Sequence, residues 1–389
     1  AAEKGNIEAM NYYGLMLLDG EGVEVDQRES TRYIKKLIKE GKADSYSRII
    51  LTTDDDISFE SVNKKKACYY FKVSADKGNV EAMLNYGLMI SKGDGVPINK
   101  EEACRYFKVA ADSGNIEAMN IYSTMLFNGE GIQANKNEAS RYCKMAADSG
   151  SFKAMYNYGM MLYKGEGVKM SKTESCKYIK MAAERGNADA MLQYGLMLSK
   201  GEGVHVNKEA ACYYFRLSAN KRNTEAMRNL GLMLAKGEGI DLDKKKACYF
   251  LKKAADRGNV EAMLNYGLMT KDGEGVPVCK KDACKYFKMA ADNGNDRAML
   301  CYATMLMNGE GVKIDIKKAY HYMKLAAYKG NPKAMMQYAL MLDNGHGVQM
   351  NKDEAQCYYK MAADKGIMDA RVYYRMSFEE SQEMKASLQ

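Results

Sequence analysis

The sequence predicts an all-α fold: a right-handed superhelix, or solenoid, of tandem 36-residue helix-turn-helix repeats. Three observations predict it. A glycine followed by a usually polar residue recurs every 36 residues, a Gly-x-Gly turn recurs at the same interval, and the apolar residues between them follow helical spacing. Because neither helix of such a unit can bury its apolar face alone, neighbouring units must stack into one continuous core.

The glycine that opens each unit sets the period. One residue is inserted after Gly41, and Arg222 replaces one glycine. The other anchors are Gly5, Gly41, Gly78, Gly114, Gly150, Gly186, Gly258, Gly294, Gly330 and Gly366. We therefore expect residues 1–389 to form a single array of about 10.5 repeats with no boundary between domains.

The first helix of each repeat, helix A, is predicted to begin after an asparagine cap such as Asn79, whose side-chain oxygen can accept from a free N–H. Pro332 follows Asn331, where the first helical position tolerates proline. The residues expected to be buried in the repeat that starts at Gly78 are Ala82, Met83, Tyr86, Met89 and Ile90. The Gly-x-Gly turn then ends helix A, because glycine accepts a positive φ.

The second helix, helix B, is predicted to begin at Asn99, with Glu102 three residues later in a capping-box pattern. The same pair recurs as Asn135/Glu138, Ser171/Glu174 and Asn351/Glu354. Its expected buried face comprises Ala103, Tyr106, Phe107, Ala110 and Ala111. Gly114 then ends helix B at the position where glycine is favoured.

These landmarks resemble the Sel-one-like repeat, a relative of the tetratricopeptide repeat. One copy reads Gly186, Ala190, Tyr194, Gly195, Gly201, Gly203, Val204, Asn207, Ala211, Tyr214, Phe215 and Ala219. The family's usual Leu before Gly is mostly Tyr in this chain. The resemblance implies an adaptor that scaffolds protein complexes, without identifying a partner; similar arrays are also fused to kinase-like domains.

The repeat pattern is interrupted in two places. Residues 42–62 lose the Gly-x-Gly turn and carry Asp54 to Asp56 instead, so 42–77 is interpreted as a degenerate repeat. Residues 367–389 are expected to form one more helix A with a polar end, which shields the last interface of an array. Residues 42–62 could form a bend, a contact site or a decayed repeat, and the sequence does not distinguish these three interpretations.

Composition excludes several classes of function. The net charge of +8 over 389 residues is weak for a nucleic-acid binder, and no apolar run is long enough to span a membrane. The chain opens in the tail of a repeat, so we expect the native N-terminus to lie upstream. The ten cysteines include no C-x-x-C, and six share one phase of helix B, too far apart between repeats for disulfides. They indicate reduced residues of a cytoplasmic protein.

Neither catalysis nor a cofactor is expected. His205, His321 and His346 occupy different phases of the repeat, and no carboxylate pair stands out from the repeating ones. The Gly-x-Gly turns follow helices rather than strands, which is unlike a phosphate-binding loop. The 31 methionines are interpreted as core residues that fill irregular gaps. No metal site is therefore predicted.

The least apolar strip of helix A is the candidate binding surface, because helix A lines the concave groove in tetratricopeptide-like solenoids. It follows the phases of Glu81, Asn85, Leu88 and Lys92. The candidate partner-binding residues are Asn85, Asn157, Gln193, Asn229, Asn265 and Gln337, with Lys164, Lys200 and Lys236 beside them to bind acidic groups. Carboxamides can pair with both groups of a peptide bond, so the strip could clamp an extended chain. The amides could equally bond only to adjacent helices.

Helix B carries a row of basic residues, from Lys72 through Lys108, Lys144 and Lys288 to Lys360. Carboxylates such as Asp112 follow most of them four residues later and largely neutralise the row, which favours a solvated outer face. The sequence thus predicts a non-catalytic scaffold that binds a protein or peptide. Two alternatives stay open: a structural part of a larger, for example cytoskeletal, assembly, and the regulatory region of a longer, kinase-like enzyme.

Overall fold

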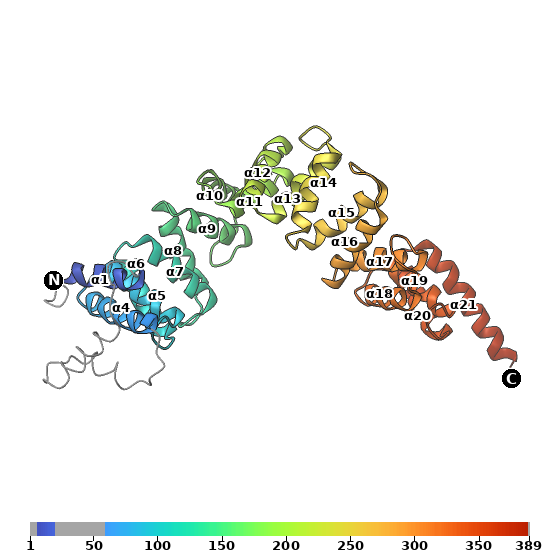
Figure 1. The fold of residues 1–389 in the computed structure, drawn as a ribbon, viewed down its shortest axis with the longest axis horizontal. Helices are drawn as coiled ribbons and strands as arrows, with labels where there is room; N and C mark the ends of the chain where they lie inside the picture. The colour runs from blue at the N-terminus through green and yellow to red at the C-terminus, as the bar shows by residue number, and fades with distance from the viewer. Residues whose placement is uncertain (1–5, 20–58, 388–389) are drawn as a thin grey trace. The chain divides into compact units, whose positions relative to one another are not determined.

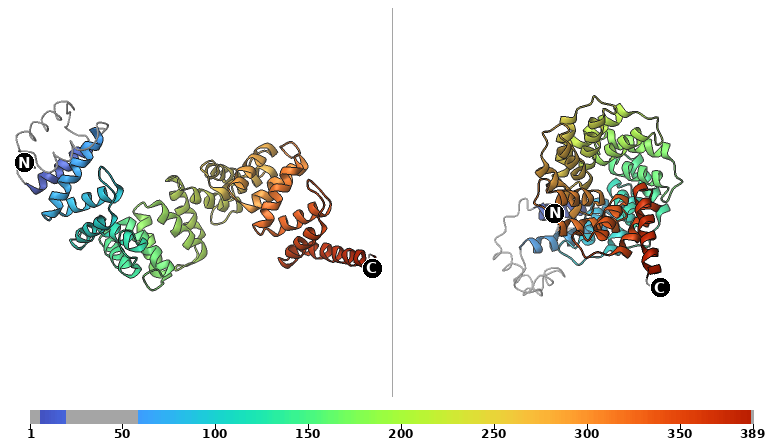
Figure 2. Two further views of the ribbon diagram at one scale, coloured as in Figure 1. Left: turned by 90° about the horizontal axis from the view of Figure 1, so that it is seen from below. Right: turned by 90° about the vertical axis from the view of Figure 1, so that its right-hand side faces the viewer.

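The computed structural model describes residues 6–19 and 59–387, and within these residues it contains α-helices and turns but no strand (Figure 1). The chain divides into two compact units. Unit 1 comprises residues 1–190 and 202–204, and unit 2 comprises residues 191–201 and 205–389. In each unit, helices that follow one another along the chain pack side by side (Figure 2). The predicted all-α solenoid of two-helix repeats is confirmed.

The helices alternate between the two types that the sequence predicts. The A helices are α1 (Ile7–Asp19), α5 (Val80–Lys92), α7 (Ile116–Asn128), α9 (Phe152–Lys164), α11 (Ala188–Lys200), α13 (Thr224–Lys236), α15 (Val260–Asp272), α17 (Asp296–Asn308), α19 (Pro332–Asp343) and α21 (Met368–Ser387). The B helices are α4 (Phe59–Asp76), α6 (Lys100–Asp112), α8 (Lys136–Asp148), α10 (Lys172–Glu184), α12 (Lys208–Asn220), α14 (Lys244–Ala255), α16 (Lys280–Asp292), α18 (Ile316–Tyr328) and α20 (Lys352–Asp364).

The predicted caps set the helix boundaries. Asn79 Oδ1 accepts from the N–H of Ala82 at 2.8 Å, and Gly93 ends α5 in the left-handed conformation with φ 81°. Gly114 closes α6: its N–H donates to Ala111 O, and the next N–H donates to Ala110 O. Because these caps recur, most of the described repeats start and stop their helices at the same phase. Exceptions include α14 and α19, which end one residue earlier, and α16, whose N-cap Cys279 forms no side-chain hydrogen bond.

The capping box of helix B differs from the predicted form in one arm. Asn99 Oδ1 accepts from the N–H of Glu102, as expected, but Glu102 accepts from the side-chain Nδ2 of Asn99 rather than from its backbone N–H. The backbone N–H of Asn99 instead donates to Ile90 O, 2.8 Å away at the end of α5. The cap thereby joins the two helices of one repeat.

The core of each repeat is a contact between helix A and helix B. All five predicted core residues of α5 are buried; on α6, Tyr106 alone is only half-buried. Tyr86 and Tyr106 pack edge to face with ring centroids 4.9 Å apart. A Cβ on Gly87 would lie 2.7 Å from the ring of Phe107, so this glycine lets the two helices approach closely.

The Gly-x-Gly turn also joins consecutive repeats, which the sequence did not reveal. The turn glycine Gly131 lies so close to the start of α6 that a Cβ on it would be 2.2 Å from Lys100 O. Glu130, between the two glycines, accepts from Lys100 Nζ at 2.7 Å. Equivalent ion pairs join Lys136 to Glu166, Lys172 to Glu202, Lys208 to Glu238, Lys244 to Glu274 and Lys280 to Glu310.

The first described helices, α1 and α4, pack directly on each other. Tyr13 and Tyr70 repeat the edge-to-face pair of the other repeats, with centroids 5.1 Å apart. The side chain of Ser74 on α4 also donates to Ile7 O. Thus α1 occupies the place of helix A for α4. The Gly-x-Gly turn of the first repeat at residues 20–23, Gly41 and most of the stretch 42–62, with Asp54 to Asp56, lie outside the described residues.

The last helix, α21, differs from a fully polar cap. Ala370 is buried, but Met368, Val372, Met376 and Phe378 are exposed. The polar end that we expected begins after this apolar stretch, at Glu379, and the side chains from residue 380 onward lie outside the described ones.

Candidate partner-binding strip on the A helices

The predicted strip contains the residues of helix A that the fold leaves accessible. On α5, Glu81 and Lys92 are exposed and Asn85 and Leu88 are half-buried, whereas most of the remaining helix is buried. The cap at Asn79 fixes the start of the helix, so the same phases face outward in each repeat. We call these four phases the strip.

In unit 1 the strip amides bond to the preceding A helix. Asn85 Nδ2 donates to Asn11 Oδ1 of α1 at 3.3 Å, and Asn157 Nδ2 donates to Asn120 Oδ1 of α7 at 3.4 Å. Each acceptor stands one position earlier in its repeat than the donor does. The structural role that the sequence left open is thus present at these two positions.

In unit 2 the strip amides lack this arrangement. The position that asparagine fills at Asn120 is leucine at Leu192, before Asn229, and at Leu300, before Gln337. Asn229 Nδ2 is buried and has no hydrogen-bond partner in the described part of the chain. Gln193 and Asn265 are half-buried and Gln337 is exposed, and none of the three forms a hydrogen bond within residues 6–19 and 59–387. Leucine offers no acceptor, which explains the difference for Asn229 and Gln337. The corresponding positions before Gln193 and Asn265 are Tyr156 and Arg228.

The predicted strip lysines are all accessible. Lys164, Lys200 and Lys236 are exposed in the last turns of α9, α11 and α13. Lys236 lies 3.8 Å from Glu238, a weak surface contact. Lysine in the last turn also favours the helix through its dipole, so this row has a structural use as well.

An apolar row runs between the amides and the lysines, and the sequence indicated it only through Leu88. Half-buried side chains hold this phase in unit 2: Leu196, Leu232, Leu268 and Leu340. Cys301 interrupts the amide phase on α17, where it is also half-buried. The strip of unit 2 thus presents carboxamides and leucines, with lysine at its last phase only on α11 and α13. Asp272 holds that phase on α15, and Asp189, Glu225 and Glu261 hold the first phase on α11, α13 and α15.

A second accessible apolar row lies in the loops before helix B, and the sequence reading missed it. Its members range from 57% to 63% exposed in seven repeats: Ile98, Met170, Val206, Leu242, Val278, Ile314 and Met350. Ala134 holds the eighth position. A Cβ on Gly93 would meet Ile98 at 2.7 Å, so each side chain covers the glycine that ends helix A. The contact with this glycine gives the buried part of each side chain a structural role.

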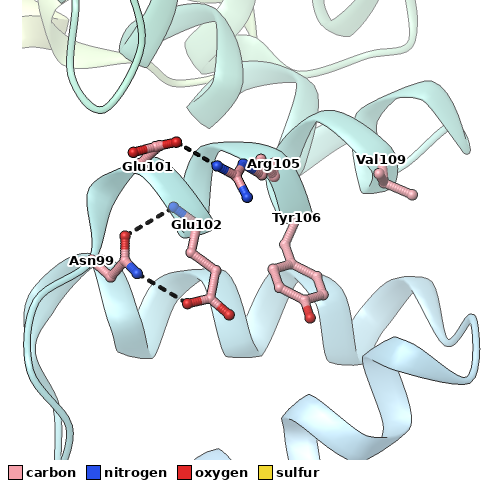
Figure 3. Close-up of a pocket in the computed structure, with 6 residues that line it drawn as sticks. All are labelled: Asn99, Glu101, Glu102, Arg105, Tyr106 and Val109. Atoms are coloured by element: carbon pink, nitrogen blue, oxygen red, sulfur yellow. Dashed lines mark hydrogen bonds and ion pairs between the residues drawn. The ribbon is translucent and has the colours of Figure 1, made fainter.

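The outer face of helix B is a network of internal ion pairs. Lys108, Lys144 and Lys288 lie 2.9, 2.8 and 2.6 Å from the aspartates four residues later, as predicted, and Lys180 pairs with Glu184. Lys72 departs from this pattern and pairs with Glu102. A shallow hollow of about 410 Å³ on α6 is lined by Asn99, Glu102, Arg105 and neighbours, but Asn99 already bonds to Glu102 and Arg105 to Glu101 (Figure 3).

The cysteines offer no reactive site in the interior. Seven are buried, Cys279 and Cys301 are half-buried, and Cys357 is exposed. Burial raises the pKa of Cys68 to about 12 and that of Cys143 to about 12, which disfavours the thiolate. Within the described residues no cluster of three potential metal-binding side chains occurs, and no helix is long and apolar enough to cross a membrane.

The fold and the strip define a class of protein: a tandem-repeat α-solenoid whose accessible helix faces are available for binding. The Sel1 repeat pattern matches residues 7–42, 59–79, 80–115, 116–151, 152–187, 188–223, 224–259, 260–295, 297–331 and 332–367. The chain therefore belongs to the Sel1 repeat family. Members of this family are generally protein-interaction scaffolds and usually non-catalytic.

Among the solved structures that are similar to this chain are two bacterial proteins. One is c5321, a protective antigen present in uropathogenic Escherichia coli strains, with 24% identity over 100% of this chain and 84% of that chain, and a TM-score of 0.77. The other is a Sel1 repeat protein from Oxalobacter formigenes, with 25% identity over 79% of this chain and 89% of that chain, and a TM-score of 0.63. No curated protein matches the sequence.

Proposed function

We propose that this chain is a non-catalytic scaffold that binds an extended segment of a partner protein along the strip of its A helices. The observation that carries the proposal is the recurrence of accessible carboxamides at one phase of helices whose other faces are mostly buried. A carboxamide donates and accepts, as a peptide group does. A row of them can therefore hold a main chain with little regard to its sequence.

The rival surface, the outer face of helix B, has less support. Its lysines at Lys108, Lys144, Lys180 and Lys288 pair with carboxylates of the same helix. A partner would have to break these pairs or accept a nearly neutral face. Only Arg216, Lys252, Lys324 and Lys360 of this row have no carboxylate partner within the described residues, so attachment through helix B would have to use these four.

The cysteines support a reducing compartment for this scaffold. None of the ten forms a disulfide, and burial raises the pKa of Cys104 to about 11, so its thiol stays protonated. Disulfides form and persist in oxidising compartments and are rare in the cytosol. On this ground we propose a cytoplasmic location.

The test is selection of a phage-displayed library of random 12-residue peptides on the full chain. Selected peptides are then measured against a variant in which Asn157, Gln193, Asn229 and Asn265 are replaced by Ala. We expect binding to be lost while the helical circular dichroism stays unchanged. The matched control reverses charge on helix B at Lys108, Lys144 and Lys288, replaced by Glu, and should retain binding. Undiminished binding to the strip variant, or loss only in the helix B variant, would overturn the proposal.

A further inference from the structure

The outer faces of α12, α14 and α16, three consecutive B helices of unit 2, differ from that of α6 (Figure 1). On α6 the outward cations are paired, Arg105 with Glu101 and Lys108 with Asp112. On the three helices of unit 2, six exposed cations have no carboxylate partner within the described residues: Arg216, Lys245, Lys252, Lys253, Lys281 and Lys285. We call the outward surface of these three helices the basic face.

The carboxylates of the basic face do not neutralise these cations. Five lie on the three helices or at their caps: Glu209, Asp243, Asp256, Asp282 and Asp292. Asp243 and Asp292 each form an ion pair with a different lysine of the same helix, and Asp256 accepts from Tyr286 Oη. Asn220 stands where α6, α8 and α10 have an acidic residue. The two carboxylates that remain leave the basic face with a net positive charge.

Two exposed tyrosines add hydroxyl groups to the basic face. Tyr213 and Tyr249 hold the phase that arginine holds on α6 and α8, and they are 56% and 52% exposed. Neither hydroxyl has a hydrogen-bond partner within the described part of the chain. Arg216 follows Tyr213 by three residues. Lys252 and Lys253 follow Tyr249 by three and four residues, so a hydroxyl and a cation share one side of each helix.

The basic face itself shows how these two kinds of donor bind a carboxylate. Asp292 accepts from Lys288 Nζ at 2.6 Å and from Tyr322 Oη at 2.7 Å. Hydrogen bonds to a charged carboxylate are stronger than those between neutral groups. On α12 and α14 a tyrosine and a cation lie together without a carboxylate of the chain to bind. A carboxylate of another molecule would complete the same arrangement.

Single-stranded nucleic acid is another extended anion, but the basic face suits it less well. Bases stack on the open face of an aromatic ring. Lys253 Nζ lies 4.4 Å from the ring centroid of Tyr249 and covers one face of that ring. The net charge of +8 over the whole chain is also weak for a nucleic-acid binder. Hydroxyl and ammonium groups are what this surface offers, and both donate to carboxylates.

We propose that the basic face binds an acidic segment of a partner protein. Tyr213 and Tyr249 donate hydrogen bonds to its carboxylates, and Arg216, Lys252 and Lys253 neutralise their charge. This surface lies on the B helices and is separate from the strip on the A helices. Neither proposal therefore depends on the other.

Fluorescence anisotropy of a labelled (Glu-Ser)6 peptide, titrated with the full chain, tests the proposal. We expect saturable binding about tenfold tighter than that of (Gln-Ser)6, because the cations attract only the charged peptide. The affinity should fall as salt rises, since charges at the surface are screened. Equal binding of the two peptides, or tighter binding of a labelled dT12 oligonucleotide, would show that the proposed ligand chemistry is wrong.

A pair of variants with equal net charge assigns the binding to the basic face. The first replaces three of its unpaired cations by Gln: Arg216, Lys252 and Lys253. The matched control replaces three exposed lysines outside the basic face by Gln: Lys169, Lys313 and Lys333. We expect the first variant to weaken binding of (Glu-Ser)6 about tenfold and the control less than about twofold. Equal losses would mean that the net charge of the chain, rather than the basic face, attracts the peptide.

Tyr213→Phe with Tyr249→Phe distinguishes paired donors from charge alone. This variant removes the two hydroxyls and keeps both rings, so we expect binding of (Glu-Ser)6 to weaken about fivefold. Unchanged binding would contradict the proposal, because the cations alone would then account for the affinity.

The strip supplies the last control. The variant with Ala in place of Asn157, Gln193, Asn229 and Asn265 should bind (Glu-Ser)6 as the wild type does. Loss of binding in that variant would place the peptide on the strip and overturn this proposal alone. Library-selected peptides that ignore the strip would overturn only the proposed function.

Discussion

Tyr178 Oη on α10 donates to Asp148 Oδ1 at the end of α8, 2.8 Å away, and so joins the B helices of consecutive repeats. Lys144 Nζ holds the other oxygen of the same carboxylate at 2.8 Å. The contact recurs from Tyr106 to Asp76, Tyr142 to Asp112, Tyr286 to Asp256 and Tyr322 to Asp292. The carboxylates that neutralise the lysine row therefore also connect repeats.

Replacing Asp148 by Asn should destabilise the array by about 1 kcal/mol at pH 7, because the charge-assisted bonds to Lys144 and Tyr178 are lost from a half-exposed site. Urea unfolding followed by circular dichroism measures the change. Asp364→Asn is the matched control, since Asp364 holds the same phase on α20 but has no tyrosine partner within the described residues. An equal loss in both variants would contradict an inter-repeat role.

The same carboxylates should make the array sensitive to acid. Tyr142 and Lys108 lower the pKa of Asp112 by hydrogen bonding; burial raises the pKa of Asp148, but bonds from Lys144 and Tyr178 outweigh it, so that this pKa too is below its usual value. A lowered folded-state pKa gives stability that is present above the unfolded value near 4 and is lost as pH falls through the folded value. The gap between wild type and Asp148→Asn should therefore shrink below pH 4. A constant gap down to pH 2 would refute this.

The second glycine of the turn should tolerate substitution far less than the glycine that ends helix B. Gly131 and Gly114 both have positive φ, at 70° and 93°, but a Cβ on Gly114 meets nothing within 4 Å whereas one on Gly131 would lie 2.2 Å from Lys100 O. We expect Gly114→Ala to cost about 1 kcal/mol through backbone strain, and Gly131→Ala to cost at least about 2 kcal/mol more through separation of the repeats. Urea midpoints of the two variants decide the order, and equal midpoints would argue against the close approach.

Thiol accessibility gives a test that needs no mutation. Ellman's reagent at pH 8 should label Cys357 within seconds to minutes and Cys279 and Cys301 more slowly, while seven buried thiols react only after denaturation. Burial disfavours the thiolate at those seven sites, as the raised pKa of Cys68 shows. Rapid labelling of more than three thiols in the native protein would show that the repeats open readily.

Sequence periodicity was sufficient for the helices, caps and core, because each depends on residues within one repeat. Asn79, Gly93 and Phe107 act on neighbours at most 20 positions away. Periodicity did not predict the contacts between repeats, because the sequence of one repeat does not show which of its residues lie beside which residues of the next repeat. Tyr178 and Asp148 are 30 residues apart, as are Lys100 and Glu130. The constant spacing of 30 residues is visible in the sequence, but nothing in the sequence indicates that residues at this spacing are in contact.

The same limit applies to the strip. Six amides share one phase and look equivalent in the sequence. Their difference arises from a residue of the preceding helix, Asn120 beneath Asn157 but Leu192 in the corresponding place before Asn229. Stacking has to be known before a paired amide can be distinguished from an unpaired one.

Stability measurements on the amides can separate these two kinds directly. Asn229→Leu removes an N–H that is buried without an acceptor and replaces it with an apolar group of similar size, so we expect it to be neutral or to stabilise the protein by up to about 1 kcal/mol. Asn157→Leu leaves Asn120 without its donor and places leucine in an exposed position, so we expect a loss of about 0.5 kcal/mol. Thermal unfolding of the two single variants shows opposite signs if the structure is right. A clear destabilisation by Asn229→Leu would mean that this amide already has a partner in the folded chain.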